Sequence, residues 1–196
     1  MSSPSAEERR HQIMDAVVDL TVSGGLQAAT FRTISDHAGV SVRLVQYYFG
    51  NKDRLLTETL AHVGRGAVER ISHALDTVDR DQPRAVIETI CEQFLPLDEY
   101  RRRAMLVFIA FRTAALTDSA LASSQTIGLL DSLVETFSEQ LGTATPHRSD
   151  EQLRAESILL ISELTGLANM MLADEIGVDE ALAILHLAID RATASA

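Results

Sequence analysis

The sequence predicts an all-α protein of about nine helices, and three observations support this class. Apolar residues recur at a spacing of three to four along most of the chain, as they do on one face of a helix. No stretch keeps the alternation of apolar and polar residues that a half-buried strand shows. The 196 residues are 46% hydrophobic and 23% charged, which is enough apolar side chain to build a core. The chain is therefore expected to be folded and helical throughout.

The first 56 residues predict three helices, of which the second and third are short, and the start of a fourth. A helix over about residues 6–23 follows a Ser-rich start, residues 1–6, which we expect to be disordered. Gly24 and Gly25 are expected to end this helix, because glycine adopts the left-handed C-cap conformation at little cost. Two shorter helices follow, each with an N-cap side chain and a closing glycine: Thr30 and Gly39 for the second, Ser41 and Gly50 for the third.

Beyond residue 56, capping side chains mark most of the helix starts. Pro83 suits the first turn of a helix, and Ser149 with Gln152 three residues later forms a capping box. Asp179 and Glu180 suit the first turn of the last helix, where carboxylates interact favourably with the helix dipole. Helices are therefore expected near residues 52–78, 83–95, 97–116, 119–141, 150–173 and 179–193.

Charge is distributed unevenly along the chain. The whole sequence has 17 basic and 28 acidic residues, a formal net charge of −11. Residues 1–56 hold six residues of each sign, so this segment is neutral and the remainder carries the whole charge of −11. A polyanion would be repelled by the acidic part, and only the first segment would tolerate it.

Several other classes of protein are excluded. Cys91 is the only cysteine, so the chain is not a disulfide scaffold. The longest apolar run, residues 104–111, has eight residues, whereas a membrane span needs about 20. The start has no secretory signal pattern, and we expect a cytoplasmic protein without membrane contact. The six histidines lack metal-ligand spacing and no glycine loop suits a phosphate, so we expect no enzyme activity, no cofactor and no metal.

Residues 31–48 have the spacing of a helix-turn-helix. Counted from Phe31, the fourth, eighth, tenth, fifteenth and eighteenth positions require apolar residues, which here are Ile34, Ala38, Val40, Val45 and Tyr48. The ninth position requires a glycine with positive φ, and Gly39 fills it. Two short helices can then cross closely, and the second is free to enter a DNA major groove. The alternative is a helical corner inside an ordinary core.

The run TFRTISDHAGVS at residues 30–41 and the run YFGNKDRLL at residues 48–56 extend this pattern. In order and spacing, the two runs resemble the TetR family of bacterial transcriptional regulators. The match covers about residues 8–56 and departs from the family pattern at four positions, Ser35, Val45, Gln46 and Gly50. The resemblance implies an N-terminal three-helix DNA-binding domain at residues 1–52. It also implies a larger helical effector-binding and dimerisation domain at residues 53–196.

The third helix offers the residues that we expect to contact DNA. Arg43 could bond guanine bidentately and Gln46 could bond adenine, each worth ~1–3 kcal/mol of discrimination. The expected base-reading residues are Val42, Arg43, Leu44, Gln46 and Tyr47. The expected phosphate contacts are Thr33, Ser41, Tyr48 and Lys52, of which the last two match family positions that hold the DNA backbone. The alternatives are a phosphate contact for Arg43 and a plain core role for Tyr48. Arg9 and Arg10 could reach DNA or lie on a solvated helix face.

Apolar runs in the second domain suggest a ligand cavity, because such cavities are mostly apolar with a few fixed polar groups. The expected pocket residues are Met105, Phe108, Phe111, Arg112, Leu130, Val134, Glu163, Leu167, Asn169 and Met171. For the three polar residues among them, the alternative is a partner between helices or at a dimer interface. Residues 105–121 resemble the effector domains of regulators near the choline-responsive branch, which implies a cationic ligand near Glu163.

The last two helices carry apolar stripes wider than one helix pair can bury, so we expect a two-fold, four-helix interface. Its expected residues are Ile158, Ile161, Thr165, Ala168, Leu182, Leu185, Ala188 and Ile189. The predicted function is a dimeric repressor that a small molecule, not identified by the sequence, releases from an inverted-repeat operator in double-stranded DNA. Two alternatives remain. One is a helical small-molecule carrier or enzyme with a non-functional helix-turn-helix corner, and the other is a regulator that acts through a protein partner.

Overall fold

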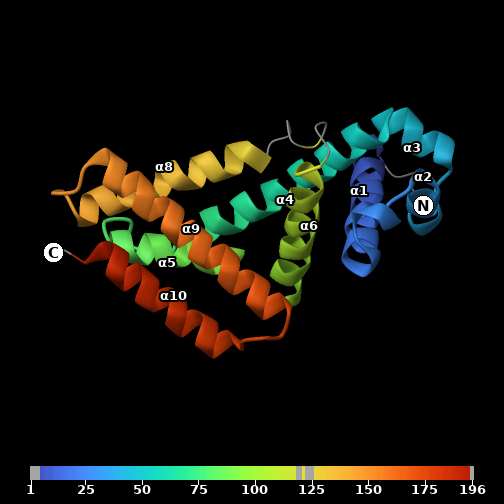
Figure 1. Ribbon diagram of the computed structural model, residues 1–196. Helices are drawn as coiled ribbons and strands as arrows, with labels where there is room; N and C mark the ends of the chain where they lie inside the picture. The colour runs from blue at the N-terminus through green and yellow to red at the C-terminus, as the bar shows by residue number, and fades with distance from the viewer. Residues whose placement is uncertain (1–4, 118–120, 122–125, 195–196) are drawn as a thin grey trace. The chain divides into compact units, whose positions relative to one another are not determined.

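The computed structural model describes residues 5–117, 121 and 126–194, with the backbone alone for residues 126–129. Every regular element among these residues is helical, which confirms the predicted all-α class (Figure 1). The elements are α1 (Ala6–Gly24), a 3₁₀ turn η1 (Leu26–Ala28), α2 (Phe31–His37), α3 (Val42–Phe49), α4 (Lys52–Leu75), α5 (Pro83–Phe94), α6 (Glu99–Ala115), α8 (Thr126–Ala144), α9 (Asp150–Leu172) and α10 (Val178–Thr193). The expected start of the next helix, at residue 119, lies outside the described residues.

Side-chain caps fix the starts of several helices where the sequence predicts them. Thr30 caps α2 and Ser41 caps α3, each by accepting a backbone N–H from the first turn. Ser149 and Gln152 form the predicted capping box of α9. A further capping box joins Ser5 to Glu8 at the start of α1, so the described structure begins within the segment that we expected to be disordered. The Ser5 backbone N–H donates to the Glu8 carboxylate, and this hydrogen bond lowers the pKa of Glu8.

The chain divides into two compact units. The first consists of Met1–Arg65 and Leu106–Ile127, and the second of Gly66–Met105 and Gly128–Ala196. The division therefore falls within α4, within α6 and at the start of α8. Each unit has buried apolar residues from several helices, and each is described below by itself.

The first unit is built around α1. Apolar side chains of α1 to α4 bury one another, and Phe111 of α6 belongs to the same cluster. The fully buried members include Ile13, Val17, Ile34, Val45, Phe49 and Leu55. Burying an aliphatic or aromatic side chain contributes roughly 1.5–3 kcal/mol, so this cluster is what holds the short helices α2 and α3 in place.

The second unit packs α10 against α9 and α5, which lie beside one another in Figure 1. Its fully buried large side chains include Ile87, Phe137, Leu141, Leu160, Leu185 and Ile189. Ser157 is a buried polar residue in this region. Its hydroxyl donates to the Leu153 carbonyl at 2.8 Å and lies 3.0 Å from the Ser138 hydroxyl, so its polar atom is satisfied. Ion pairs among the described residues also join helices of this unit, from α5 to α10 and from α9 to α10.

One of these helices, α9, is long and apolar enough by length and composition to cross a membrane, with 39% of its most apolar window buried in this fold. A core helix of a soluble protein meets the same criterion. Leu160, Leu164 and Leu167 of α9 are buried against the rest of the second unit. Packing within this unit therefore accounts for part of the apolar composition of α9, whereas Ile158 and Leu159 remain exposed.

Cys91 provides a test of how tightly the second unit is packed. Its thiol is fully buried on α5, and burial raises its pKa to about 12, with smaller contributions from Glu92 and Glu88. Burial therefore keeps the thiol in its unreactive, protonated form at pH 8. We expect no reaction of the native protein with a thiol-specific disulfide reagent at pH 8, and one equivalent of reaction in denaturant. Rapid stoichiometric labelling of the native protein would contradict this packing.

Candidate nucleic-acid interface

A short turn between α2 and α3 forms the helix-turn-helix. Gly39 has φ +63°, the left-handed conformation that the spacing predicts, and Ala38 beside it is 5% exposed. The backbone N–H of Val40 donates to the Ser35 carbonyl at 2.9 Å and closes the turn. Ile34 of α2 is fully buried in the core of the first unit. A larger side chain at residue 39 would be strained by its backbone conformation, although the space around it is open.

The third helix has one buried side and one exposed side. Val45 and Phe49 are fully buried, one turn apart, and anchor α3 to the core of the first unit. The exposed side chains are those of Val42, Arg43, Gln46 and Tyr47, and Tyr47 is 80% exposed. Leu44 is half-buried. Four of the five predicted base-reading residues therefore lie on the surface of a helix of eight residues, and a B-DNA major groove is wide enough to admit an α-helix.

Arg10 of α1 holds the C-terminal end of α3. Its guanidinium donates to the Tyr48 carbonyl at 3.0 Å, lies 4.8 Å from the centre of the Phe49 ring, and forms an ion pair with Glu58 of α4. These contacts assign Arg10 a positioning role in place of the DNA contact considered for it. Sequence reasoning missed this role, since the bonded residues are 38 positions apart and no local pattern connects them.

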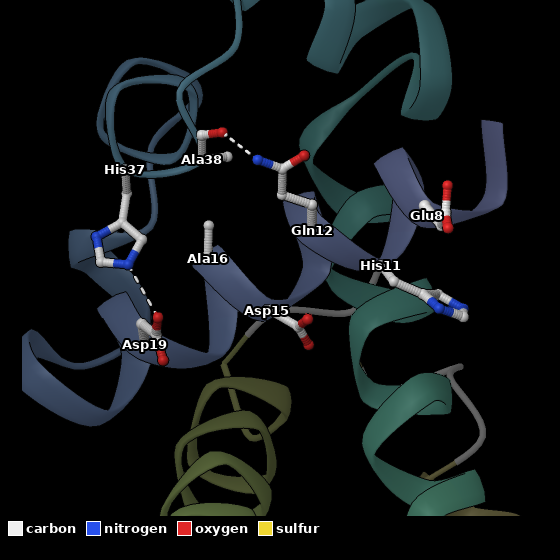
Figure 2. A pocket seen from close by; sticks show the side chains of 8 residues that line it. All are labelled: Glu8, His11, Gln12, Asp15, Ala16, Asp19, His37 and Ala38. Atoms are coloured by element: carbon white, nitrogen blue, oxygen red, sulfur yellow. Dashed lines mark hydrogen bonds and ion pairs between the residues drawn. The ribbon is translucent and has the colours of Figure 1, made fainter. Parts of the chain in front are cut away.

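A hydrogen bond and an ion pair also join α1 to the C-terminal end of α2, as Figure 2 shows. The Gln12 amide donates to the Ala38 carbonyl at 2.7 Å, and Asp19 lies 2.9 Å from the His37 ring nitrogen. The same region forms an open hollow lined by Glu8, His11, Gln12, Asp15, Ala16, Asp19, His37 and Ala38. Three carboxylates line this hollow, so its charge disfavours a phosphate there.

The predicted phosphate contacts differ in how their side chains are engaged. The Thr33 hydroxyl donates to the Ala28 carbonyl at 2.6 Å and accepts the Thr30 N–H, so its proton is used within the chain. The Ser41 hydroxyl accepts the Leu44 N–H at 3.2 Å, which leaves its own proton for donation. Lys52 is half-buried at the first position of α4. Tyr48 is half-buried, and its ring lies edge-on to the Tyr47 ring at 5.4 Å.

The predicted effector residues belong to both units. Phe108, Phe111 and Arg112 are in the first, where Phe111 is buried and the Arg112 guanidinium lies 5.6 Å from the Phe108 ring. The others are in the second unit, where Met105, Val134, Leu167 and Met171 are buried and Leu130 is exposed.

Two of the three polar members of the predicted pocket, Glu163 and Asn169, have hydrogen-bond or ion-pair partners within the chain. Glu163 of α9 forms a 3.0 Å ion pair with Arg191 of α10, and the Asn169 amide donates to the Thr165 carbonyl at 2.9 Å. For Glu163 this is the interhelical role that the sequence left open. Its carboxylate is already paired, which weakens the expectation that it binds a cationic ligand.

The residues predicted at the dimer interface are mostly buried within the chain. Ile161, Ala168, Leu185, Ala188 and Ile189 are at most 8% exposed and belong to the core. Thr165 and Leu182 are half-buried, and Ile158 is 43% exposed. Other apolar side chains of the same two helices are exposed instead, among them Leu159 and Met170 on α9 and Ile184 and Leu187 on α10. Any interface made by these helices would therefore use the second set together with Ile158.

Two family models match the chain. Residues 13–59, which contain the helix-turn-helix, match the model described as bacterial regulatory proteins of the tetR family. Residues 83–194 match the model described as the C-terminal domain of BetI-type transcriptional repressors. Between the two matches lie residues 60–82, which include most of α4 and the loop before α5.

Curated proteins of similar sequence are also transcriptional regulators. The HTH-type transcriptional regulator BetI of Paraburkholderia phymatum is 27% identical over 152 residues, which cover 76% of this chain and 77% of the relative. BetI of Yersinia pestis is 25% identical over 186 residues, or 93% of this chain and 91% of the relative. These relatives are named as regulators of transcription and not as enzymes.

Solved structures share the fold over almost the whole chain. A transcriptional regulator from Rhodococcus sp. Rha1 has a TM-score of 0.78 at 26% identity, covering 94% of this chain and 93% of its own. A putative transcriptional regulator from Saccharomonospora viridis, solved in complex with choline, has a TM-score of 0.83 at 20% identity and covers 94% and 96% of the two chains. Since the BetI-type model alone spans more than half of the chain, the protein belongs to the TetR family of bacterial transcriptional regulators, with a C-terminal domain of the BetI repressor type.

Proposed function

We propose that the protein is a dimeric repressor that reads an inverted-repeat operator through the exposed side of α3. The observation that carries this proposal is the division of α3 into a buried side, Val45 and Phe49, and an exposed side with hydrogen-bonding groups. Arg43 offers paired donors suited to guanine, and Gln46 offers a donor and an acceptor suited to adenine. Helix α3 contains no acidic residue, so it brings no negative charge to the DNA.

Phosphate contacts flank this helix. Lys52 lies in the first turn of α4, where free backbone N–H groups and the helix dipole favour an anion. Ser41, at the N-terminus of α3, has a hydroxyl proton to donate. Such contacts fix the position of a protein on DNA without reading its sequence, and each one releases a counterion.

Replacing Lys52 with alanine tests this arrangement. We expect weaker binding to every duplex and a salt dependence, measured as the slope of log K against log salt, that falls by about one unit. Fluorescence anisotropy at several salt concentrations measures both quantities. Arg80→Ala is the matched control, because it removes one exposed positive charge from the loop before α5. Equal slopes for wild type and Lys52→Ala would exclude Lys52 as a phosphate contact.

We propose that two chains associate through α9 and α10. Ile158 and Leu159 of α9, and Ile184 and Leu187 of α10, are each at least 40% exposed, on helices that pack against each other. Gly166 of α9 has open space around the position of a Cβ, so the backbone is accessible to a close neighbour there. A two-fold interface of this kind places one recognition helix at each half-site of an inverted repeat. The carrier or enzyme alternative leaves the exposed polar side of α3 without a role.

The effector is proposed to be a small quaternary ammonium compound that binds in the second unit and lowers DNA affinity. Support comes from the BetI-type C-terminal match and from the choline complex of the structural neighbour. A ligand that favours a conformation with the wrong half-site spacing weakens DNA binding by its differential affinity for the two states. Titrating choline into the protein–operator complex tests the class. Unchanged operator affinity, in the presence of choline that calorimetry shows to be bound, would contradict release by this ligand.

A further inference from the structure

Helices α5 and α10 of the second unit bring two glutamates and a histidine together. Glu88 and Glu92 lie one helical turn apart on α5, and His186 lies on α10. One oxygen of each carboxylate and one ring nitrogen of the histidine all lie within 4.8 Å of one another. All three residues are half-buried. The two helices pack against each other directly, so their relative placement does not depend on how the two units are arranged.

The Nε2 atom of His186 makes an ion-pair contact in this cluster but no aligned hydrogen bond among the described residues, and the side chain is 38% exposed. The Nε2 atom itself is buried and lies only 2.9 Å from Glu88 Oε1. Buried polar atoms without an aligned hydrogen bond are uncommon, and a bound ion is one of the physical reasons for them. A lone pair on Nε2 that faces two carboxylates can be satisfied by a cation between them.

The surrounding charges leave room for such a cation. Arg84 of α5 pairs with the other oxygen of Glu88 and donates to Asp190 of α10 at 2.6 Å. These contacts raise the pKa of the Arg84 guanidinium, and the hydrogen bond to Asp190 is the main cause. Three carboxylates against one guanidinium give a formal charge of −2 when His186 is neutral. A divalent cation would bring the cluster to neutrality.

We infer that Glu88, Glu92 and His186 form a binding site for a divalent transition-metal ion of the zinc type, which joins α5 to α10. Imidazole nitrogen and carboxylate oxygen are donors that Zn²⁺ binds at about 2.0–2.2 Å. Tetrahedral bonds of that length place ligand atoms about 3.3–3.6 Å apart. The 4.8 Å limit seen here therefore requires a shift of about 1 Å, which side-chain rotation supplies. Cys91, between the two glutamates in sequence, does not take part, since its thiol is buried.

The ion would stabilise the second unit, because a ligand that binds only the folded state shifts unfolding by mass action. Helix α10 also carries Ile184 and Leu187, two of the residues proposed at the dimer interface. Occupation of the site would thus fix the helix on which that interface depends. This role is separate from the proposed operator binding and from the proposed ammonium effector.

The test uses untagged, full-length protein stripped of metal by a chelator. Equilibrium dialysis against Zn²⁺ measures stoichiometry and affinity, and Co²⁺ provides a spectroscopic probe of the ligands. We expect one Zn²⁺ per chain, a higher melting temperature with Zn²⁺, and a visible Co²⁺ spectrum. His186→Gln and Glu92→Gln are each expected to weaken binding at least tenfold, since even outer-shell partners contribute roughly 10–100-fold. Glu88 is left unchanged because it also holds Arg84.

The control variant is His73→Gln, the same substitution at an exposed histidine of the second unit. It is expected to bind Zn²⁺ as the wild type does. Circular dichroism of the metal-free variants checks that each one is folded. Wild-type protein that retains no Zn²⁺, or His186→Gln and Glu92→Gln variants that bind it as tightly as the control, would overturn the site. Operator binding by metal-free protein is scored separately, so failure here leaves the proposed function untouched.

Discussion

Replacing Phe49 with alanine is expected to destabilise the DNA-binding unit by about 3–5 kcal/mol. The ring is fully buried among α1, α2 and α4 side chains, and the Arg10 guanidinium lies over it at 4.8 Å. Its removal leaves a cavity and takes away one of the two residues that anchor α3. Such a loss is comparable with the whole stability of a small domain, so DNA binding should disappear together with the fold. Urea denaturation followed by circular dichroism measures the change.

The matched control is Tyr47→Ala, which removes the neighbouring aromatic side chain on the opposite side of α3. Tyr47 is 80% exposed, so this substitution is expected to change stability by no more than about 0.5 kcal/mol. It is nevertheless expected to weaken operator binding. A stable, DNA-binding Phe49→Ala variant would mean that α3 is held by contacts other than those described.

Replacing Leu187 with aspartate is expected to dissociate the dimer into monomers and to reduce operator affinity by about 10²–10⁴-fold. The side chain is 59% exposed on α10, next to Ile184 on the same face. A carboxylate there meets its symmetry copy or an apolar surface, and both arrangements oppose association. Each monomer would then bind one half-site without the gain from a linked second site. Sedimentation velocity measures the mass, and anisotropy with a two-half-site duplex measures the affinity.

Val68→Asp is the control for this experiment, because it introduces the same charge at an aliphatic side chain of α4 that is 57% exposed. It is expected to leave a dimer with wild-type affinity. A Leu187→Asp variant that remains dimeric would place the interface elsewhere. A monomeric variant that still binds the full operator tightly would show that dimerisation does not contribute to DNA recognition.

Local features of the sequence predicted much of the first unit. The caps Thr30 and Ser41, the positive φ of Gly39 and the buried positions Ile34 and Val45 depend on neighbours only a few residues away. Short stretches of sequence are enough to predict such features, because the hydrogen bonds of helix caps and turns join residues only a few positions apart. The exposed positions of α3 follow from the same periodicity.

Contacts between distant residues could not be predicted in this way. The bond from Arg10 to the Tyr48 carbonyl and the ion pair of Glu163 with Arg191 depend on which helices become neighbours. The apolar stripe on α10 predicted that this helix has an apolar face, but not which of its apolar side chains face the core of their own chain. Leu185 and Ile189 face the core of their own chain, whereas Leu187 between them is exposed. A periodicity of 3.6 defines faces of a helix, and tertiary packing decides which face is covered.

Selection from a random duplex DNA pool, followed by sequencing, tests most directly whether α3 reads an operator. The account predicts enrichment of an inverted repeat whose half-sites lie about one helical turn apart. Arg43→Ala and Gln46→Ala should each relax the preference at particular base pairs, by ~1–3 kcal/mol, while the rest of the repeat is kept. Arg80→Ala should return the wild-type repeat. Folded dimer that enriches no sequence at low salt, or an unchanged repeat from both α3 variants, would contradict the account.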